Sequence, residues 1–356
     1  MIKNRVETIK NALREGEGFL VESVFNRFYY TGFETTAGAV LITPHSSSFL
    51  IDFRYFEKAK EVVNSSEVLL SNRTNGEIKE LCDKYRVKKL YVETSKTSLS
   101  RFADLSKSLE GIEILNDDRF DRLTEEMRMI KSEGELSLIK TAQEFTDETF
   151  KYILPRIEAG RTEKEIMLDM EFFIRKLGSE GVGFSFIVVS GKNSSLPHGV
   201  PSDKKLEKGD FVTMDFGGAY KGYRADMTRT VAIGSVSDEQ RAVYNKVLEA
   251  QLAVLKDVRA GLVCKDVDKI ARDIIHSAGY EGCFGHGLGH SLGIQIHEDP
   301  RFNTVCETVL RPGMIMTVEP GIYLENRFGV RIEDLVYITE NGALNLTRSP
   351  KELIIL

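Results

Sequence analysis

Several kinds of residue and pattern are scarce in this 356-residue sequence, and each scarcity excludes a class of protein. Proline and glycine number only 8 and 29, too few for a collagenous or low-complexity chain. The four cysteines show no Cys-x-x-Cys spacing, so we expect them to be reduced, with no disulfide framework and no thiolate metal site. Basic residues are not in excess either, because 48 Lys and Arg stand against 54 Asp and Glu. A net charge of −6 does not favour a phosphate backbone, and we expect no nucleic-acid partner.

Long apolar runs are also missing. No window reaches the roughly 18 apolar residues that would span a bilayer. The first ten residues place charge in every turn, whereas a secretory signal needs an unbroken apolar segment. We therefore expect a cytoplasmic protein with no membrane partner.

What the sequence does contain is enough apolar material, 42% of its residues, for two domains with separate cores. Residues 1–123 alternate amphipathic helical stretches with short β-branched runs such as 39–43, which is typical of an α/β domain. A charged passage at 117–126 then precedes a long helix expected to begin near Ser132. We predict a boundary at this passage and a second domain over residues 124–356.

The second domain contains an internal repeat. Residues 156–181 align without gaps on residues 257–282, with seven identical residues in 26 positions. Each copy reads as the end of one helix, an Ala-Gly break and a second helix closed by glycine. A duplicated unit predicts two pseudo-symmetric halves with a site between them.

The repeat continues into a pair of acid-bearing hairpins. Residues 206–217 align on 310–321, and a further β-rich run follows each segment. The carboxylates that correspond between the copies are Asp215 with Glu319, and Asp226 with Glu333. Because the same positions carry acids twice, we favour a shared site over the alternative that each acid lies on a solvated strand face.

The turn between the strands of the first hairpin predicts where its acids point. If Lys221-Gly222 forms a two-residue turn, Asp215 lies opposite Thr228 and Asp226 is its diagonal neighbour on the same face. Four carboxylates that converge unpaired would repel one another strongly. Bound cations are the expected remedy.

Between the hairpins, residues 284–297 hold three of the six histidines. The spacing of His286 and His290 is that of a zinc-protease helix, but three glycines at 285–289 argue against a helix and for closely approached backbone. A lone histidine is usually structural, whereas this cluster accompanies four acids. One imidazole with four carboxylates suits a pair of divalent ions, Mn²⁺, Co²⁺ or Zn²⁺.

Such a pair of ions implies hydrolysis. Two cations about 3.5–4 Å apart would lower the pKa of a bridging water and make a hydroxide nucleophile at neutral pH. The remaining histidines, His198, His286 and His297, could polarise a carbonyl oxygen or carry a proton to the leaving nitrogen. We expect His297 on the polar face of a strand that follows Gly293, because apolar and polar residues alternate there.

Five short segments resemble the pita-bread metallopeptidases, which include aminopeptidase P, prolidase, methionine aminopeptidase and the metal-free creatinases. They are Val212-Thr-Met-Asp-Phe-Gly-Gly, Arg224-Ala-Asp-Met-Thr-Arg-Thr, His286-Gly-Leu-Gly-His, Thr317-Val-Glu-Pro-Gly and Val330-Arg-Ile-Glu-Asp. The resemblance covers about residues 127–356 and implies an α+β pita-bread catalytic domain with an internal pseudo-two-fold repeat. It also implies a set of five metal ligands, all present, which disfavours the creatinase branch: Asp215, Asp226, His290, Glu319 and Glu333.

The same resemblance implies roles for four more residues. His198 and His297 would contact the substrate carbonyl and transfer protons, and Arg331 would orient the neighbouring acids. For His286, packing behind the site and direct substrate contact are both open.

The amino-terminal part is similar to the creatinase-type N-terminal domain, through Phe28-Tyr-Tyr-Thr-Gly-Phe and Ile51-Asp-Phe-Arg-Tyr. Methionine aminopeptidases generally lack this domain, so the resemblance points to enzymes that act at Xaa-Pro bonds, often as homodimers. We expect an Xaa-Pro aminopeptidase with proline-containing peptides as substrates. The alternatives are a prolidase restricted to Xaa-Pro dipeptides, which would need a basic side chain for the product-side carboxylate, and a catalytically silent binding protein on the same fold.

Overall fold

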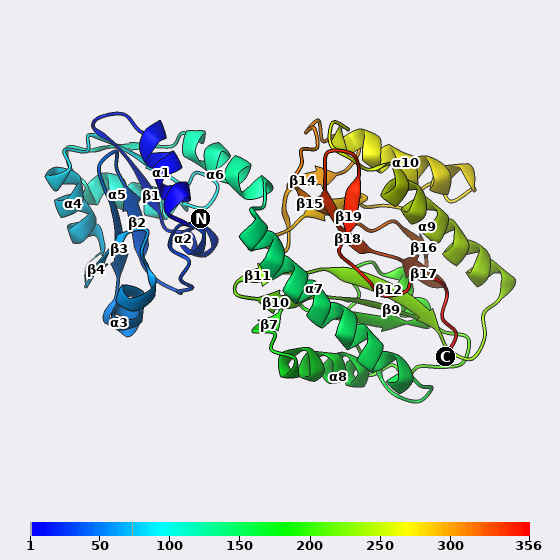
Figure 1. Ribbon diagram of the computed structural model, residues 1–356. Helices are drawn as coiled ribbons and strands as arrows, with labels where there is room; N and C mark the ends of the chain where they lie inside the picture. Colours follow the sequence, from blue (N-terminus) through cyan, green and yellow to red (C-terminus); the bar gives the residue numbers. More distant parts are fainter. Residues whose placement is uncertain (1, 73) are drawn as a thin grey trace. The chain divides into compact units, whose positions relative to one another are not determined.

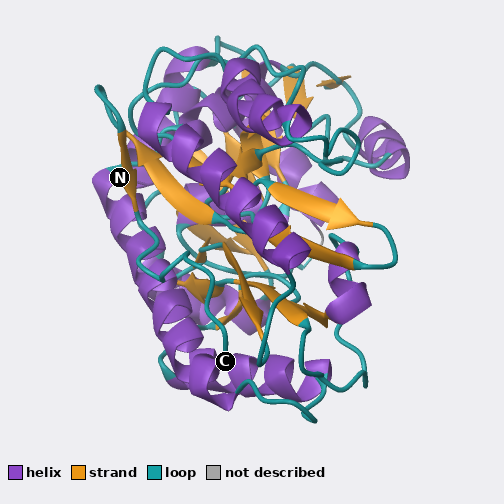
Figure 2. Cartoon of the chain, turned by 90° about the vertical axis from the view of Figure 1, so that its right-hand side faces the viewer, coloured by secondary structure: helices purple, strands orange, loops and turns teal. Residues whose placement is uncertain are grey.

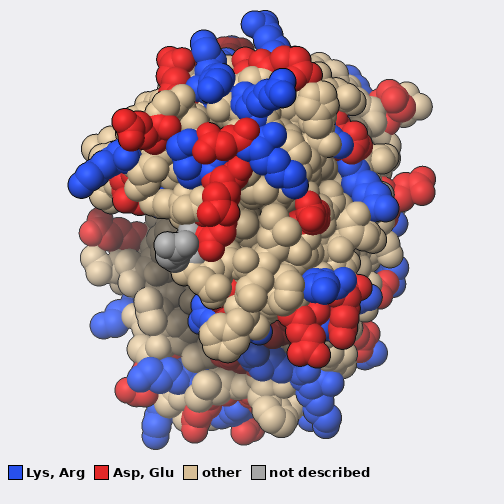
Figure 3. All heavy atoms as spheres, turned by 90° about the vertical axis from the view of Figure 1, so that its left-hand side faces the viewer, with Lys and Arg blue, Asp and Glu red and all other residues tan. Residues whose placement is uncertain are grey.

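The computed structural model describes residues 2–72 and 74–356 and divides the chain into two compact units, Met1–Arg128 and Met129–Leu356. Among the described residues, no helix is both long enough and apolar enough to cross a bilayer. The face in Figure 3 shows basic and acidic side chains interspersed rather than gathered by sign. That pattern agrees with the absence of an overall positive charge.

The first unit is a mixed sheet with helices packed against it (Figure 1). Its strands are β1 Glu17–Val21, β2 Ala39–Ile42, β3 Ser47–Ile51, β4 Glu67–Leu70, β5 Lys89–Val92 and β6 Glu113–Leu115. Its helices are α1 Ile2–Ala12, α2 Val24–Thr31, α3 Phe53–Val62, α4 Thr74–Lys84, α5 Leu99–Ser108 and α6 Arg119–Met129. The strand order is β4-β3-β2-β1-β5-β6, with antiparallel β1–β2 and parallel β1–β5 pairs, which confirms the expected α/β class.

The domain boundary predicted between residues 123 and 124 falls inside helix α6. The charged passage that suggested a connection is folded as an amphipathic helix, with Phe120 and Thr124 buried in the first unit. The compact unit accordingly extends to Arg128. A charged run marks a linker in sequence only when none of its residues has a core to face.

The second unit combines four long helices with several small sheets. The helices are α7 Glu133–Ile153, α8 Glu163–Lys176, α9 Asp238–Asp257 and α10 Cys264–Ser277, with 3₁₀ turns η1 Leu154–Arg156 and η2 Gly191–Ser195. The first seven strands are β7 Gly181–Val182, β8 Ile187–Ser190, β9 Phe211–Phe216, β10 Gly218–Tyr220, β11 Tyr223–Arg224, β12 Met227–Ala232 and β13 Gly289–Ser291. The remaining strands are β14 Glu298–Phe302, β15 Ile315–Val318, β16 Gly321–Leu324, β17 Phe328–Arg331, β18 Asp334–Ile338 and β19 Ala343–Asn345.

Helix α7 begins where the sequence predicted. Ser132 is its N-cap, and Ser132 and Glu135 form a reciprocal capping box that satisfies two backbone donors of the first turn. The buried face of α7 includes Ile139, Ala142 and Phe150. Periodicity and capping chemistry therefore agree at this position.

The duplicated unit is visible in the fold. Helices α7 and α8 lie on one side of the strands and α9 and α10 on the other, and Figure 2 shows helices covering strands in this unit. The break between the helices of each pair falls at a glycine with positive φ, 97° at Gly160 and 88° at Gly261. Each pair leads to a hairpin-like strand pair, β9–β12 in the first half and β15–β18 in the second.

Candidate metal centre

The first acid-bearing hairpin has the predicted geometry. Lys221 and Gly222 form a two-residue turn with φ of 47° and 80°, and Tyr220 pairs with Tyr223 across it. Asp215 is opposite Thr228 in the β9–β12 ladder. Asp226 lies directly before β12, so both acids of this hairpin approach the same space.

The second hairpin places its acids just outside the ladder. Val318 pairs with Asp334 at the end of β15–β18, so Glu319 follows one strand and Glu333 precedes the other. The small β16–β17 hairpin fills the longer connection between them. This hairpin is longer than its counterpart β10–β11 in the first copy, which is the reason that the sequence did not fix the register of the second copy.

His290 lies on the short strand β13, not on a helix. A Cβ at Gly289 would lie 2.1 Å from the carbonyl oxygen of Thr317, so only glycine permits this approach. The His290 amide donates to Thr317 Oγ1 at 3.0 Å, and that hydroxyl donates to Glu319 Oε1 at 3.1 Å. The glycine-rich segment therefore brings the imidazole to the acids, as its composition predicted.

All nine residues singled out from the sequence line one cavity of about 430 Å³. They are His198, Asp215, Asp226, His286, His290, His297, Glu319, Arg331 and Glu333. Ligand atoms of Asp226, His290 and Glu333 lie within 4.8 Å of one another. His290 Nε2 is 3.4 Å from Glu319 Oε1 and 3.6 Å from Asp226 Oδ2, which is close enough for shared coordination.

Three buried carboxylate oxygens in this cavity have no hydrogen-bond partner among the described residues: Asp215 Oδ1, Asp226 Oδ1 and Glu333 Oε1. Burial raises the pKa of Asp226 and Glu333 well above the ordinary range, and repulsion between the acids adds to the effect. Burial likewise raises the pKa of Glu319 to about 8. Unpartnered oxygens on mutually repelling acids fit divalent cations, which would pair with the oxygens and restore the charged forms.

The other oxygens of these acids are fixed by the protein. Arg331 Nη2 donates to Asp215 Oδ2 at 2.7 Å, and its Nε donates to Thr228 Oγ1 at 3.0 Å. The Thr228 hydroxyl in turn donates to Glu333 Oε2 at 2.7 Å. Arg331 thus contacts one acid directly and a second through Thr228.

His290 is held in its neutral form. Its Nδ1 is 3.0 Å from the carbonyl oxygen of Ser291, which can only accept, so Nδ1 carries the proton and Nε2 faces the acids with its lone pair. Burial lowers the pKa of His290 to about 3, with the nearby His297 adding to the effect. An imidazole that stays neutral is ready to bind a metal without first losing a proton.

The other three histidines occupy different positions around the cavity. His198 and His297 are solvent-exposed at its rim, and His286 is half-buried. His286 Nε2 is 3.0 Å from the Tyr323 hydroxyl, and burial lowers its pKa to about 4. Tyr323 also accepts from Arg331 Nη1 at 2.8 Å. It was not identified from the sequence because it lies in the β16–β17 hairpin, whose register the alignment of the two copies left open.

The expectation that His297 lies on a strand is wrong. Residues 293–297 form a series of bends between β13 and β14. The Gly293 amide donates to the carbonyl of Gln295, and the Gln295 amide donates to Glu298 Oε1, both at 3.0 Å. These local bonds replace a strand ladder, and alternation of side chains alone could not reveal them.

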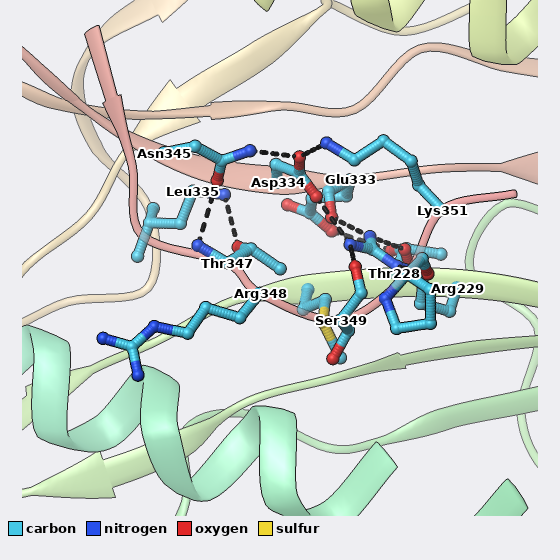
Figure 4. Close-up of polar contacts among 12 residues, drawn as sticks. Thr228, Arg229, Glu333, Asp334, Leu335, Asn345, Thr347, Arg348, Ser349 and Lys351 are labelled. Atoms are coloured by element: carbon cyan, nitrogen blue, oxygen red, sulfur yellow. Dashed lines mark hydrogen bonds and ion pairs between the residues drawn. The ribbon is translucent and has the colours of Figure 1, made fainter. Parts of the chain in front are cut away.

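Behind the acids, on the same strands, lies a second cluster of buried charge that the sequence did not reveal (Figure 4). Arg229 and Asp334 form an ion pair at 2.7 Å with both side chains at most 1% exposed. Asn345 and Lys351 donate to the other oxygen of Asp334. Arg229 also donates to the carbonyl oxygens of Glu333, Ser349 and Pro350.

Comparison with known proteins identifies the family of the chain. The family described as metallopeptidase family M24 matches residues 137–340, and the creatinase/prolidase N-terminal domain matches residues 5–130. An Xaa-Pro dipeptidase of Pyrococcus horikoshii is 37% identical over 334 residues, 92% of each chain. These matches confirm the resemblance inferred from the motifs.

Two solved structures extend the likeness to the whole fold. The Xaa-Pro dipeptidase from Bacillus anthracis superposes with a TM-score of 0.95 at 39% identity and full coverage of both chains. The X-Pro aminopeptidase from Thermotoga maritima gives 0.91 at 37% identity, covering 98% of this chain and 100% of its own. Together with the described geometry, these findings confirm the pita-bread fold, and the chain belongs to metallopeptidase family M24 with a creatinase/prolidase N-terminal domain.

Proposed function

We propose that this metallopeptidase hydrolyses the peptide bond between an N-terminal residue and proline, using two divalent ions held by Asp215, Asp226, His290, Glu319 and Glu333. The observation that carries the proposal is the set of unpartnered carboxylate oxygens that face one cavity together with the neutral His290. When bound, a pair of ions would activate a water as nucleophile and polarise the scissile carbonyl. Oxygen-rich ligands with one imidazole suit Mn²⁺, Co²⁺ or Zn²⁺.

The protein's own residues would supply the rest of the chemistry. His198 and His297, exposed at the rim of the cavity, are placed to donate to the substrate carbonyl and to pass a proton to the leaving nitrogen. Arg331 would hold Asp215 in its ligating orientation through the 2.7 Å bond. His286 would hold the Tyr323 hydroxyl, which contacts Arg331, and would not contact the substrate itself.

The walls of the cavity support proline as the residue after the scissile bond. Phe184, Ile187, Ile296 and Phe302 line it beside the polar groups, and an apolar wall suits a pyrrolidine ring. The nitrogen of an Xaa-Pro bond carries no hydrogen, so recognition must come from the ring rather than from an N–H donor.

A specific observation favours dipeptides over longer peptides, as a second form of the same activity. Arg301 lines the cavity, and its side chain is about half exposed. Its ion pair with Asp299 is long, at 3.9 Å. Arg331, the other arginine of the cavity wall, is already engaged by Asp215. Arg301 is therefore placed to receive the C-terminal carboxylate that proline carries in an Xaa-Pro dipeptide.

Two measurements test the proposal. Uptake of about two equivalents of Mn²⁺, Co²⁺ or Zn²⁺ after dialysis supports the metal centre, whereas a folded chain that takes up none would favour a catalytically silent binding protein. Hydrolysis of Xaa-Pro is then compared with that of Xaa-Pro-Yaa. If the Arg301→Met variant raises KM for dipeptides alone, the dipeptidase form is supported, while equal activity on both peptides in the unaltered enzyme supports an aminopeptidase.

We propose a cytoplasmic homodimer, as enzymes with this N-terminal domain often form. Sedimentation equilibrium of the purified chain tests the assembly, and a single species at the mass of one chain, 40.1 kDa, would contradict it.

A further inference from the structure

A buried lysine lies directly before helix α7. The Lys131 side chain is 1% exposed, and its Nζ donates to Ser291 Oγ at 3.1 Å and to Glu298 Oε2 at 3.2 Å. Glu298 is itself only 6% exposed at its side chain. Lysine is almost never buried without a partner, so the residues that it contacts indicate its purpose.

Both partners directly follow a histidine of the cavity. Ser291 is next to His290, and Glu298 is next to His297. The two partners are also paired with each other across β13 and β14, at the point where a bulge shifts the strand register. Lys131 therefore bridges the two ends of the loop 292–297.

Two further contacts hold the same loop. Glu298 uses its other oxygen to accept the Gln295 amide at 3.0 Å, so the carboxylate that binds Lys131 also binds the loop. The carbonyl oxygen of Gly293 accepts the Arg224 amide at 2.9 Å, which links the loop to the segment before Asp226. The result is an edge-to-face pair of imidazoles, with the ring centroids of His290 and His297 4.5 Å apart.

We infer that Lys131 is a positioning residue that sets the placement of His297 relative to His290 by closing this loop through Glu298 and Ser291. The inference rests on the proposed function, because the effect on turnover requires His297 to act in catalysis. Lys131 itself lies outside the residues that line the cavity, so it acts through its partners.

The test compares Lys131→Met with a matched control, Lys204→Met. Lys204 is a partly buried lysine of the second unit that is likewise paired with an acid, Asp210, at 2.6 Å, but it is not among the residues that line the cavity. With the metal-loaded enzyme and an Xaa-Pro dipeptide, we expect Lys131→Met to lower kcat about tenfold or more and to change KM less than about threefold. Lys204→Met should lower the melting temperature with kcat within about twofold of the unaltered enzyme.

A second variant separates positioning from folding. Lys131→Met removes the ammonium that pairs with the buried Glu298 carboxylate, whereas Lys131→Met with Glu298→Gln also removes the charge of that carboxylate. We expect the double variant to recover much of the melting temperature but not kcat. Hydrogen exchange gives a readout without activity: amides of residues 292–297 should exchange faster in both Lys131 variants than in Lys204→Met.

The inference is overturned if folded Lys131→Met keeps its kcat, or if the double variant recovers kcat together with melting temperature. Unchanged hydrogen exchange of residues 292–297 would also overturn it. An unaltered enzyme that binds metal but cleaves no Xaa-Pro peptide would instead overturn the proposed function. The loop-exchange result would still decide whether Lys131 closes the loop.

Discussion

Glu333 and Asp334 are consecutive residues whose buried carboxylates differ in their partners and in the direction of their pKa shifts. Glu333 faces the cavity with one oxygen unpartnered among the described residues, and burial with repulsion from Glu319 raises its pKa well above the ordinary range. Asp334 faces the other way, where Arg229, Lys351 and Asn345 all donate to it and its pKa is lowered despite burial. Charge that serves structure is fully paired inside the chain, whereas the charge proposed to bind metal is left for a ligand to pair.

The largest effect on stability is expected from removing the cation that pairs with Asp334. Replacing Arg229 with Met removes the guanidinium from a pair in which both side chains are at most 1% exposed. We expect a loss of about 3 kcal/mol or more in the free energy of unfolding, because a buried carboxylate loses its main cation. Denaturant titration of the metal-free protein measures it, and a loss below about 1 kcal/mol would contradict the structural role.

The second test neutralises the carboxylate of Glu333, which faces the cavity. Glu333→Gln keeps the size of the side chain and can still accept from the Thr228 hydroxyl, but it removes a proposed metal ligand. We expect the metal-free protein to be as stable as the unaltered chain, and activity with metal to fall by more than about 100-fold. Retention of both activity and two equivalents of metal would show that Glu333 is not a ligand.

A pH series sharpens the contrast between the two clusters. Glu319 has a folded-state pKa of about 8, above its unfolded value near 4.5. Its contribution to stability is therefore fully present below pH 4.5 and is lost as the pH rises towards 8. Metal-free protein should lose melting temperature over this window, and a divalent cation at pH 8 should restore it. A Glu319→Gln variant should show a weaker decline.

The pKa of Asp334 is shifted in the opposite direction from that of Glu319, so its effect on stability has the opposite dependence on pH. Its folded-state pKa is lowered, so the stability that it contributes is present above the ordinary aspartate pKa, near 3.8, and is lost as the pH falls through the folded value. Below pH 4 the unaltered chain should therefore lose stability faster than Asp334→Asn. Equal acid sensitivity of the two proteins would contradict the pairing described.

The smallest expected effect comes from removing a peripheral partner. Lys351 donates to Asp334 beside Arg229 and Asn345, and its side chain is 17% exposed. Lys351→Met should cost about 1 kcal/mol in the free energy of unfolding, because two partners remain. Activity with metal should stay within about twofold, and a much larger loss would indicate that Lys351 shapes the cavity as well.

The residues of the candidate site were predictable from sequence because their signals are local or repeated. The Lys221-Gly222 turn fixed the register that brings Asp215 opposite Thr228, and the duplication pointed to Glu319 and Glu333. The glycines around His290 indicated close backbone approach, which the 2.1 Å distance at Gly289 explains. Each of these inferences uses neighbours in sequence or an aligned copy.

What escaped prediction depends on partners distant in sequence. Lys131 is 160 residues from Ser291, and Arg229 is 105 residues from Asp334, so no pattern in one window joins them. The bends at 293–297 include a hydrogen bond from the Gln295 amide to a side-chain oxygen of Glu298, which side-chain alternation cannot show. The charged passage at 117–126 contributes to helix α6 because Phe120 faces the core of the first unit, and charge alone does not reveal that burial.

The bonds that order the acids also join the two halves of the repeat. Arg331 of the second half reaches Asp215 of the first, and Thr228 of the first reaches Glu333 of the second, each at 2.7 Å. A cation bound by acids of both copies would stabilise the contact between the two halves of the repeat. Metal occupancy and the cohesion of the two copies should therefore rise and fall together, so that heat resistance becomes a direct gauge of how full the centre is.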